Sequence, residues 1–261
     1  MTKKALMVVS FGTSAPEAGY AITNIENVCR RAFPKYDFFR AFTSKMIIRK
    51  LKQTQGLNIL NPEEVLDKLV MENYDEVICQ PTHVLKGREY EKILEVLEHY
   101  RGKIPGLKLG DPLLVTEEDY RRTAEIMLEA SGKARMEDEA TVFMGHGTEH
   151  QANQAYHKMN DLLHEMGYDR AFVGTVEGTP SLDDVLNELD RRQLKKACLM
   201  PMLIVAGNHV REDLAGDQEN SWKSRFKARG IQTEIILKGL GELDDIARIY
   251  VDHIRKAEKL P

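Results

Sequence analysis

The chain has 261 residues, of which 42 % are hydrophobic and 30 % are charged, and its formal net charge is −4. This is the composition of a globular protein with enough length for one large domain or two of ordinary size. The mild charge excludes a general attraction to nucleic acid or membrane surfaces, and no apolar stretch approaches the roughly 18 residues of a membrane span.

Strands and helices alternate in the first half of the chain. The run ALMVVS at residues 5–10 predicts a buried strand, and Asn61 followed by Pro62 and two acids is typical of a helix start. The same rules predict further strands over residues 36–42, 76–80 and 107–110, and helices over residues 16–32, 45–53, 62–73, 86–100 and 117–130. Such alternation is typical of parallel sheets with helices on both faces.

A polar segment without periodicity, SGKARMEDE at residues 131–139, interrupts this pattern and is the best candidate for a linker. Beyond it the alternation restarts, with strands predicted over residues 140–144, 171–176, 197–205 and 231–237 and helices over residues 151–167, 181–191, 218–228 and 240–256. We therefore predict an α/β protein of two similar domains, residues 1–135 and 136–261, each with a parallel sheet flanked by helices. Whether the last helix packs back on the N-terminal domain stays open.

The two halves also resemble each other in sequence. VVSFGTS at residues 8–14 aligns with FMGHGTE at an offset of 135, and QPTHVLKGREYEKIL at residues 80–94 aligns with MPMLIVAGNHVREDL at an offset of 120. Each half thus has a strand that ends in a glycine-threonine turn and a later strand that ends in a proline-led segment. The pattern indicates a duplicated α/β unit.

Three candidate ligands follow three successive strands of the second half. His146 lies in a glycine-flanked turn after the first strand, Glu177 follows the second and His209 follows the third, while His83 lies at the matching strand end of the first half. In open parallel sheets, ligands bind outside these carboxyl ends. Two imidazoles and a carboxylate suit Co²⁺, Ni²⁺, Fe²⁺ or Zn²⁺, and three protein ligands leave coordination positions open. Histidine can also accept a proton near neutral pH.

A simpler interpretation of His146 stays open, because a strand-end histidine is often a turn residue with a satisfied hydrogen bond. His146 and His150 are four residues apart, as in helical zinc pairs, but Gly145 and Gly147 argue against a helix through both. The glycines instead leave His146 with little side-chain cover from its neighbours, which favours close approach of a ligand.

Two further patterns favour solvated helix faces. His150, His157 and His164 are spaced by seven, about 10.5 Å along a helix axis, which is too far for one shared ion; the alternative to a solvated face is a weak ion-relay face. Residues 30–60 contain a single acid, Asp37, among many bases; the alternative here is a cationic wall for an anionic ligand. The bases are Arg30, Arg31, Lys35, Arg40, Lys45, Arg49, Lys50 and Lys52.

The chain start and the cysteines favour a cytoplasmic protein. The apolar run at residues 5–9 is too short for a signal peptide. Cys29, Cys79 and Cys198 are odd in number and far apart, so we expect inert thiols and no zinc or iron–sulfur site. The glycine turns lack the GxGxxG and GxxxxGK[ST] patterns of nucleotide sites, and no GxSxG hydrolase motif is present.

Four blocks of sequence together resemble a known family. GHGTEHQAN with His146, VEGTPSLDDV with Glu177, PMLIVAGNHVREDLAGD with His209, and SFGTS near the start are similar to the anaerobic-type sirohydrochlorin cobaltochelatases, and the resemblance extends over residues 5–254. It implies the class II chelatase fold, with two similar α/β domains and an active-site cleft between them. It also implies insertion of Co²⁺, the substrate metal, into sirohydrochlorin to give cobalt-sirohydrochlorin for cobalamin biosynthesis, without ATP or an organic cofactor.

The same resemblance implies roles for individual residues. His146, Glu177 and His209 would bind the metal, and His146 would also be the proton acceptor. Because sirohydrochlorin is a polycarboxylate, the basic residues gain a plausible partner. Our candidates for substrate binding are Phe11, His83, Lys86 and Arg49.

Two alternative functions stay open, a ferrochelatase acting on sirohydrochlorin for siroheme or on a protoporphyrin, and a non-catalytic carrier of metal or tetrapyrrole. An apolar protoporphyrin would need fewer cations around it, so the basic stretch Arg30–Lys52 weighs against this substrate. Neither a nucleic acid nor a membrane is expected as a partner. No heptad pattern distinguishes a monomer from a homo-oligomer.

Overall fold

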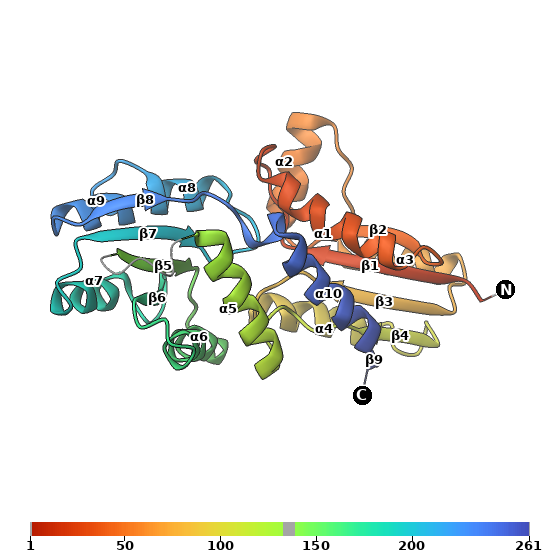
Figure 1. Ribbon diagram of the computed structural model, residues 1–261. Coiled ribbons are helices and arrows are strands. Elements are labelled where there is room, and N and C mark those ends of the chain that lie inside the picture. Colours follow the sequence, from red (N-terminus) through yellow and green to blue (C-terminus); the bar gives the residue numbers. More distant parts are fainter. Residues whose placement is uncertain (1, 133–138, 261) are drawn as a thin grey trace. The chain divides into compact units, whose positions relative to one another are not determined.

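The computed structural model describes residues 2–132 and 139–260, with the side chain of His209 left out (Figure 1). The chain forms two compact units. Unit 1 comprises Met1–Val115 and Gly241–Pro261, and unit 2 comprises Thr116–Leu240. Most of the predicted linker, residues 133–138, lies outside the described residues.

Unit 1 contains a five-stranded sheet in the order β2-β1-β3-β4-β9, in which β9 alone is antiparallel to its neighbour. The strands are β1 (Lys4–Ser10), β2 (Asp37–Phe42), β3 (Glu76–Pro81), β4 (Gly106–Leu109) and β9 (Glu258–Lys259). The helices are α1 (Gly19–Ala32), α2 (Lys45–Gln55), α3 (Pro62–Met71), α4 (Arg88–Glu98) and α10 (Asp244–Lys256). Helix α3 begins after Asn61 as predicted, and its start has a capping box, in which Asn61 and Glu64 each accept the other's backbone N–H.

Unit 2 contains a four-stranded, fully parallel sheet in the order β6-β5-β7-β8. The strands are β5 (Glu139–Gly145), β6 (Ala171–Thr175), β7 (Lys196–Pro201) and β8 (Gln232–Ile235). The helices are α5 (Glu117–Ser131), α6 (Gln154–Glu165), α7 (Leu182–Arg191), α8 (Asn208–Ala215) and α9 (Trp222–Ala228), with a short 3₁₀ turn η1 (Gln151–Asn153). A second 3₁₀ turn, η2 (Leu240–Glu242), spans the point in the chain where unit 2 ends and unit 1 resumes. The predicted α/β class with parallel sheets flanked by helices is confirmed.

The two units have the same topology. Their first four strands follow the same order, with β1 and β5 in equivalent central positions. Each unit closes its own apolar core, built around Met7, Leu66 and Leu97 in unit 1 and around Met144, Leu186 and Phe226 in unit 2. The two halves, which are similar in sequence, therefore also have the same strand order.

The unit boundaries differ from those expected from sequence. Helix α5 belongs to unit 2, since it packs against α6 and its Tyr120 ring lies 4.4 Å from Lys158 Nζ. Helix α10 belongs to unit 1, where it packs on α1 and β3 and Tyr250 donates a hydrogen bond to Thr82 O at 3.0 Å. The packing of α5 therefore places the first boundary before this helix. The polar segment that suggested a boundary at residue 135 follows the helix.

Two elements were missed in the sequence. Helix α8 was not predicted, although the offset of 120 aligns it with α4. Gly87 and Gly207 cap these helices with the same extended backbone. The two-residue strand β9 has too few residues to show a period. None of the described helices combines the length and apolarity needed to cross a membrane.

Candidate metal site and substrate pocket

His146 and Glu177 follow the neighbouring strands β5 and β6. Strand pairing continues into the two turns, since Val176 N donates to Gly145 O at 3.2 Å and Glu177 N donates to His146 O at 2.8 Å. The side chains therefore emerge together, with His146 Nδ1 3.6 Å from Glu177 Oε2. Both are about two-thirds exposed, at 64 % and 67 %. This pair forms the described part of the candidate metal site.

The hydrogen bond of His146 indicates which ring nitrogen is available. Nδ1 lies 3.1 Å from Gly147 O, and because a carbonyl can only accept, Nδ1 carries the proton. Nε2 is then the nitrogen with a free lone pair for a metal or a proton.

Two glycines around His146 serve packing within unit 2. A Cβ on Gly147, which has φ of +81°, would lie 2.5 Å from Gly178 N, and a Cβ on Gly145 would lie 2.2 Å from the Tyr156 ring. The expectation that these glycines leave room for a ligand is wrong on the side of the missing Cβ, because protein atoms fill the space there. Their small size instead lets the turns after β5 and β6 contact each other.

His209 lies in the first turn of α8, beyond the end of β7. Met202 N donates to Met144 O at 2.8 Å, so the chain leaving β7 still follows the end of β5. The backbones of His146, Glu177 and His209 thus follow the adjacent ends of β5, β6 and β7. The His209 side chain lies outside the described residues, and the described side chains form no cluster of three or more potential metal ligands.

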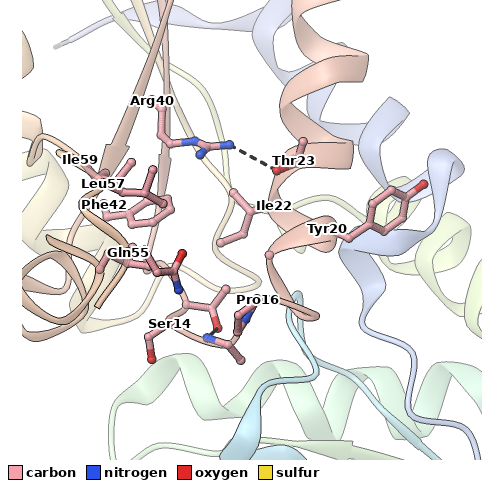
Figure 2. Close-up of a pocket in the computed structure, with 14 residues that line it drawn as sticks. Ser14, Pro16, Tyr20, Ile22, Thr23, Arg40, Phe42, Gln55, Leu57 and Ile59 are labelled. Carbon is pink, nitrogen blue, oxygen red and sulfur yellow. Dashed lines mark hydrogen bonds between the residues drawn. The ribbon is translucent and has the colours of Figure 1, made fainter. Parts of the chain in front are cut away.

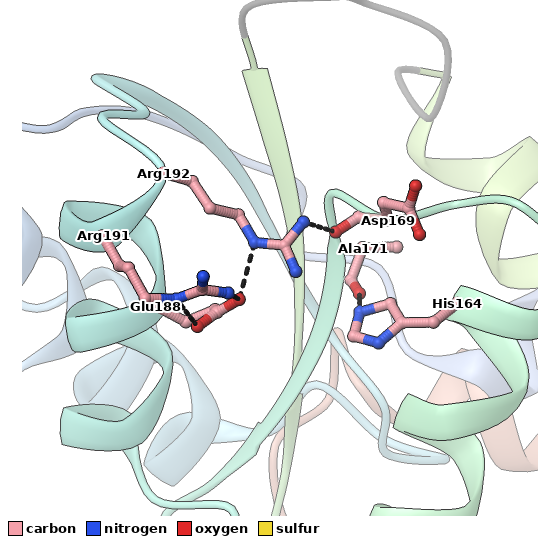
Figure 3. Close-up of polar contacts among 6 residues, drawn as sticks. All are labelled: His164, Asp169, Ala171, Glu188, Arg191 and Arg192. Carbon is pink, nitrogen blue, oxygen red and sulfur yellow. Dashed lines mark hydrogen bonds and ion pairs between the residues drawn. The ribbon is translucent and has the colours of Figure 1, made fainter.

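The other histidines of unit 2 have structural partners. His150 Nδ1 accepts the Ala152 N–H at 3.1 Å and caps η1. His157 Nε2 lies 2.9 Å from Thr179 Oγ1, and His164 Nε2 donates to Ala171 O at 3.1 Å (Figure 3). His157 and His164 thus bind the turn after β6 and β6 itself, whereas His150 binds the backbone of its own turn, so these half-buried side chains do more than face solvent.

Unit 1 repeats the glycine turn without the ligands. Gly12 has φ of +96°, and Ser44 N donates to Phe11 O at 3.2 Å, as Glu177 N does to His146 O. The backbone pattern is shared, but an exposed phenylalanine and a serine occupy the two ligand positions. Phe11 is thus an apolar group at the strand ends of unit 1.

The remaining substrate-binding candidates differ in their surroundings. Both ring nitrogens of His83 are buried without a hydrogen-bond partner among the described residues. Burial lowers the pKa of His83 to about 4, against a smaller opposing effect of Glu89, so the ring is neutral at pH 7. Lys86 Nζ lies 2.6 Å from Asp111 Oδ1, and Arg49 is exposed on α2. His83 is therefore a half-buried residue whose ring nitrogens have no hydrogen-bond partner among the described residues.

A pocket of about 290 Å³ in unit 1 was not predicted (Figure 2). It lies beside the turn after β1, and its lining includes Ile22, Phe42, Leu57 and Arg40. Two guanidinium nitrogens of Arg40, Nε and Nη2, donate to the two carboxylate oxygens of the buried Glu26, and the distance from Nε to Oε1 is 2.7 Å. Arg40 is therefore a neutralised cation, which weakens the predicted cationic wall. Arg40 and Phe42 lie on one face of β2, because successive side chains of a strand point to opposite faces. This alternation was the feature of the sequence from which part of the pocket lining could have been predicted.

The three cysteines are buried, and Cys198 Sγ donates to Ser131 O at 3.9 Å. Burial, reinforced by the nearby Glu26 charge, raises the pKa of Cys29 to about 12, and burial raises the pKa of Cys79 as well. These thiols are protonated at neutral pH and supply no thiolate ligand.

Comparison with solved structures defines the class of the fold. SirB from Bacillus subtilis with Fe³⁺ superposes with a TM-score of 0.68 at 15 % identity, covering 98 % of this chain and 95 % of that chain. CbiX, described as the terminal enzyme for biosynthesis of siroheme in denitrifying bacteria, superposes with a TM-score of 0.59 at 14 % identity, covering 97 % and 99 %. The protein has the fold of the class II chelatases.

Sequence comparison narrows the class to a family. The cobalt chelatase (CbiK) family matches residues 4–259. The chain is 40 % identical to the sirohydrochlorin cobaltochelatase of Salmonella typhimurium, over 98 % of this chain and 96 % of that protein. It is 33 % identical to sirohydrochlorin cobaltochelatase CbiKC of Nitratidesulfovibrio vulgaris, over 98 % and 91 %. The chain belongs to the cobalt chelatase (CbiK) family.

Proposed function

We propose that this protein is a sirohydrochlorin cobaltochelatase, which inserts Co²⁺ into sirohydrochlorin without ATP or an organic cofactor and so supplies cobalt-sirohydrochlorin for cobalamin biosynthesis. Two full-length relatives bear that activity in their names. The observation that carries the proposal is the contact between His146 and Glu177 at the adjacent ends of β5 and β6.

In the proposed reaction, Co²⁺ replaces the two pyrrole N–H protons of the macrocycle, so the products are the cobalt complex and two protons. His146, Glu177 and His209 hold the ion with coordination positions left open, which suits a metal that must be released. When Co²⁺ passes to the macrocycle nitrogens, His146 Nε2 regains its lone pair and accepts one pyrrole proton. The second proton goes to the Glu177 carboxylate or to water.

The proposed substrate contacts follow from the described environment of unit 1. The buried ring nitrogens of His83 lack partners among the described residues, so a polar group of the macrocycle would satisfy them. Phe11 offers an exposed apolar surface to a ring face, and Arg49 and Lys86 are cations for its carboxylates. Arg49 is the stronger candidate cation, because Lys86 is already bound to Asp111.

The ligand set predicts limited discrimination between metals. A site of two imidazoles and one carboxylate binds Ni²⁺ and Cu²⁺ at least as tightly as Co²⁺ in the general order of affinities. We therefore expect insertion of Fe²⁺ as well as Co²⁺ in vitro. A strict requirement for Co²⁺, with no activity towards Fe²⁺, would contradict this expectation.

One absorbance assay tests the proposed function. Purified protein is mixed with sirohydrochlorin and with Co²⁺ or Fe²⁺, and the macrocycle spectrum is followed against the spontaneous reaction. We expect a rate enhancement that His146→Ala and His209→Ala both abolish. Enhancement with Fe²⁺ alone would support the ferrochelatase alternative, and binding of metal and macrocycle without enhancement would support a carrier.

A further inference from the structure

Asn153, the last residue of η1, bonds both turns of the candidate metal site. Its side chain is buried, with 8 % of the residue exposed. Oδ1 accepts the Thr148 N–H at 3.1 Å, and Nδ2 donates to Thr179 O at 2.7 Å. Thr148 is two residues beyond His146, and Thr179 is two residues beyond Glu177. One amide thus joins the backbone after one ligand to the backbone after the other.

The packing around this amide is tight. A Cβ on Gly178 would lie 2.4 Å from Asn153 Oδ1, and a Cβ on Gly147 would lie 2.5 Å from Gly178 N. The two turns and the amide therefore contact one another directly, without space for a larger side chain. Since the amide has a donor facing a carbonyl and an acceptor facing an N–H, its orientation is determined by both partners.

Unit 1 shows that the glycine turn forms without such an amide. The offset of 135 that aligns Gly12 with Gly147 places Ala18 at the position of Asn153. The turn of unit 1 nevertheless keeps its left-handed glycine and the hydrogen bond from Ser44 to Phe11. The amide is thus present in the unit that carries His146 and Glu177 and is replaced by a methyl group in the other.

We propose that Asn153 is a positioning residue that holds the turns of His146 and Glu177 at the separation needed to bind one Co²⁺ ion. This inference rests on the proposed metal site. His146 and Glu177 are mostly exposed and gain little order from side-chain packing, so their placement depends on the backbone that carries them. Groups that orient metal ligands commonly change metal affinity by about 10- to 100-fold when removed.

The test compares Asn153→Ala with Asn160→Ala. Asn160 lies on α6 and its Oδ1 accepts the Val173 N–H at 3.1 Å, so it also joins this helical segment to a strand of unit 2, but away from the ligand turns. The dissociation constant of Co²⁺ is measured by titration, the KM for Co²⁺ by the insertion assay, and Tm by circular dichroism. We expect Asn153→Ala to raise both metal constants about 10-fold or more, and Asn160→Ala to lower Tm with Co²⁺ affinity unchanged.

A second variant keeps the test valid if Asn153→Ala does not fold. Asn153→Asp retains the acceptor for Thr148 N but places a carboxylate oxygen against Thr179 O, so we expect it to weaken Co²⁺ binding too. Parental Co²⁺ affinity in the folded Asn153 variants would overturn the proposal. Equal losses of affinity in the Asn153 and Asn160 variants would also overturn it, because they would indicate general destabilisation.

His146→Ala separates failure of this inference from failure of the proposed function. If His146→Ala abolishes Co²⁺ binding while the Asn153 variants bind normally, the positioning role is wrong and the metal site stands. If His146→Ala binds Co²⁺ like the parent, the proposed site is wrong, and the inference about Asn153 fails with it.

Discussion

Single residues without side chains determine the geometry of the candidate metal site. Gly147 combines a left-handed backbone with contact to the Gly178 backbone, and Glu177 N reaches His146 O across the same contact. His146 and Glu177 are exposed, whereas the residues that place their turns are buried or have no side chain. Substitutions that leave every ligand intact can therefore damage the site.

We expect Gly147→Ala to destabilise unit 2 more than Gly167→Ala. Both glycines are left-handed, at φ of +81° and +86°, and this conformation costs other residues about 1–3 kcal/mol. An added Cβ meets open space at Gly167 but backbone atoms at Gly147. Urea unfolding followed by the fluorescence of Trp222, the single tryptophan, measures unit 2. Equal losses in the two variants would contradict the steric argument.

His83 gives a prediction in which stability and function change in opposite directions. Replacing it by leucine removes two buried nitrogens that have no partner among the described residues, so we expect substrate-free His83→Leu to be at least as stable as the parent at pH 7. We expect weaker sirohydrochlorin binding, measured by spectral titration. The exposed His99→Leu on unit 1 is the control, and equal binding by both variants would exclude a role for His83 in binding.

The pH dependence of stability tests the environment of His83. Burial lowers the pKa of His83 from 6.5 to about 4. Below pH 6.5 the unfolded chain therefore binds a proton at His83 that the native state does not bind. The parent therefore loses stability as pH falls from 6.5 towards 4, and His83→Leu does not incur this loss. We expect the Tm difference between variant and parent to grow from pH 7 to pH 5. A constant difference would show that the native ring titrates normally.

At the scale of elements, α7 is tied to the start of β6 by an ion cluster (Figure 3). Glu188 accepts from Arg191 and from Arg192, and Arg192 also donates to Asp169 O at 2.8 Å. The hydrogen bond from Arg191, with help from Arg192 and against desolvation, lowers the pKa of Glu188 to about 2. The cluster thus connects the helix that follows the Glu177 turn to the strand that precedes it.

Glu188→Gln should destabilise unit 2 at pH 7 by roughly 0.5–1 kcal/mol, the size expected for a partly exposed ion pair. Because the native pKa is depressed, this contribution is complete above the unfolded value of 4.5 and is lost as pH falls towards 2. Trp222 fluorescence in urea at pH 7 and pH 3 measures the difference from the parent, which should shrink at pH 3. Glu165→Gln, on the exposed part of α6, is the control. A pH-independent difference would refute the ion-pair account.

At the scale of the whole molecule, the two units have the same topology but carry different residues at their equivalent turns. Unit 2 carries the described pair of candidate ligands, and unit 1 carries the equivalent turn with Phe11 and Ser44 instead. A metal bound in unit 2 should therefore stabilise that unit through its own contacts.

We expect Co²⁺ to shift the urea transition reported by Trp222. A ligand at 100 times its dissociation constant stabilises the state that binds it by about 2.7 kcal/mol. His146→Ala should remove the shift, while Arg49→Ala, a change in unit 1 outside the metal ligands, should retain it. A Trp222 transition unaffected by saturating Co²⁺ would contradict a metal site in unit 2.

Much of the fold was predictable, because alternating strands and amphipathic helices have local periods. Helix α8 was missed, since glycine and asparagine at its start give a weak helix signal. The unit boundaries differ from those expected because α5 packs within unit 2 and α10 packs within unit 1. For the site, the rule that ligands gather at carboxyl strand ends placed His146 beside Glu177, where a contact of 3.6 Å is observed. The roles of the histidine stripe and of Gly145 depended on long-range contacts and were misread.

By itself, the sequence determined the α/β class, the duplication and the identity of the candidate ligands, since these follow from local periods and from residue types that metals require. The tertiary structure alone decided that Tyr156 fills the space beside Gly145, that Glu26 neutralises Arg40 and that Asn153 joins the two ligand turns. Each of these contacts pairs residues that are distant or unpatterned in the chain. Their partners are selected by packing and hydrogen bonding, which no local period encodes.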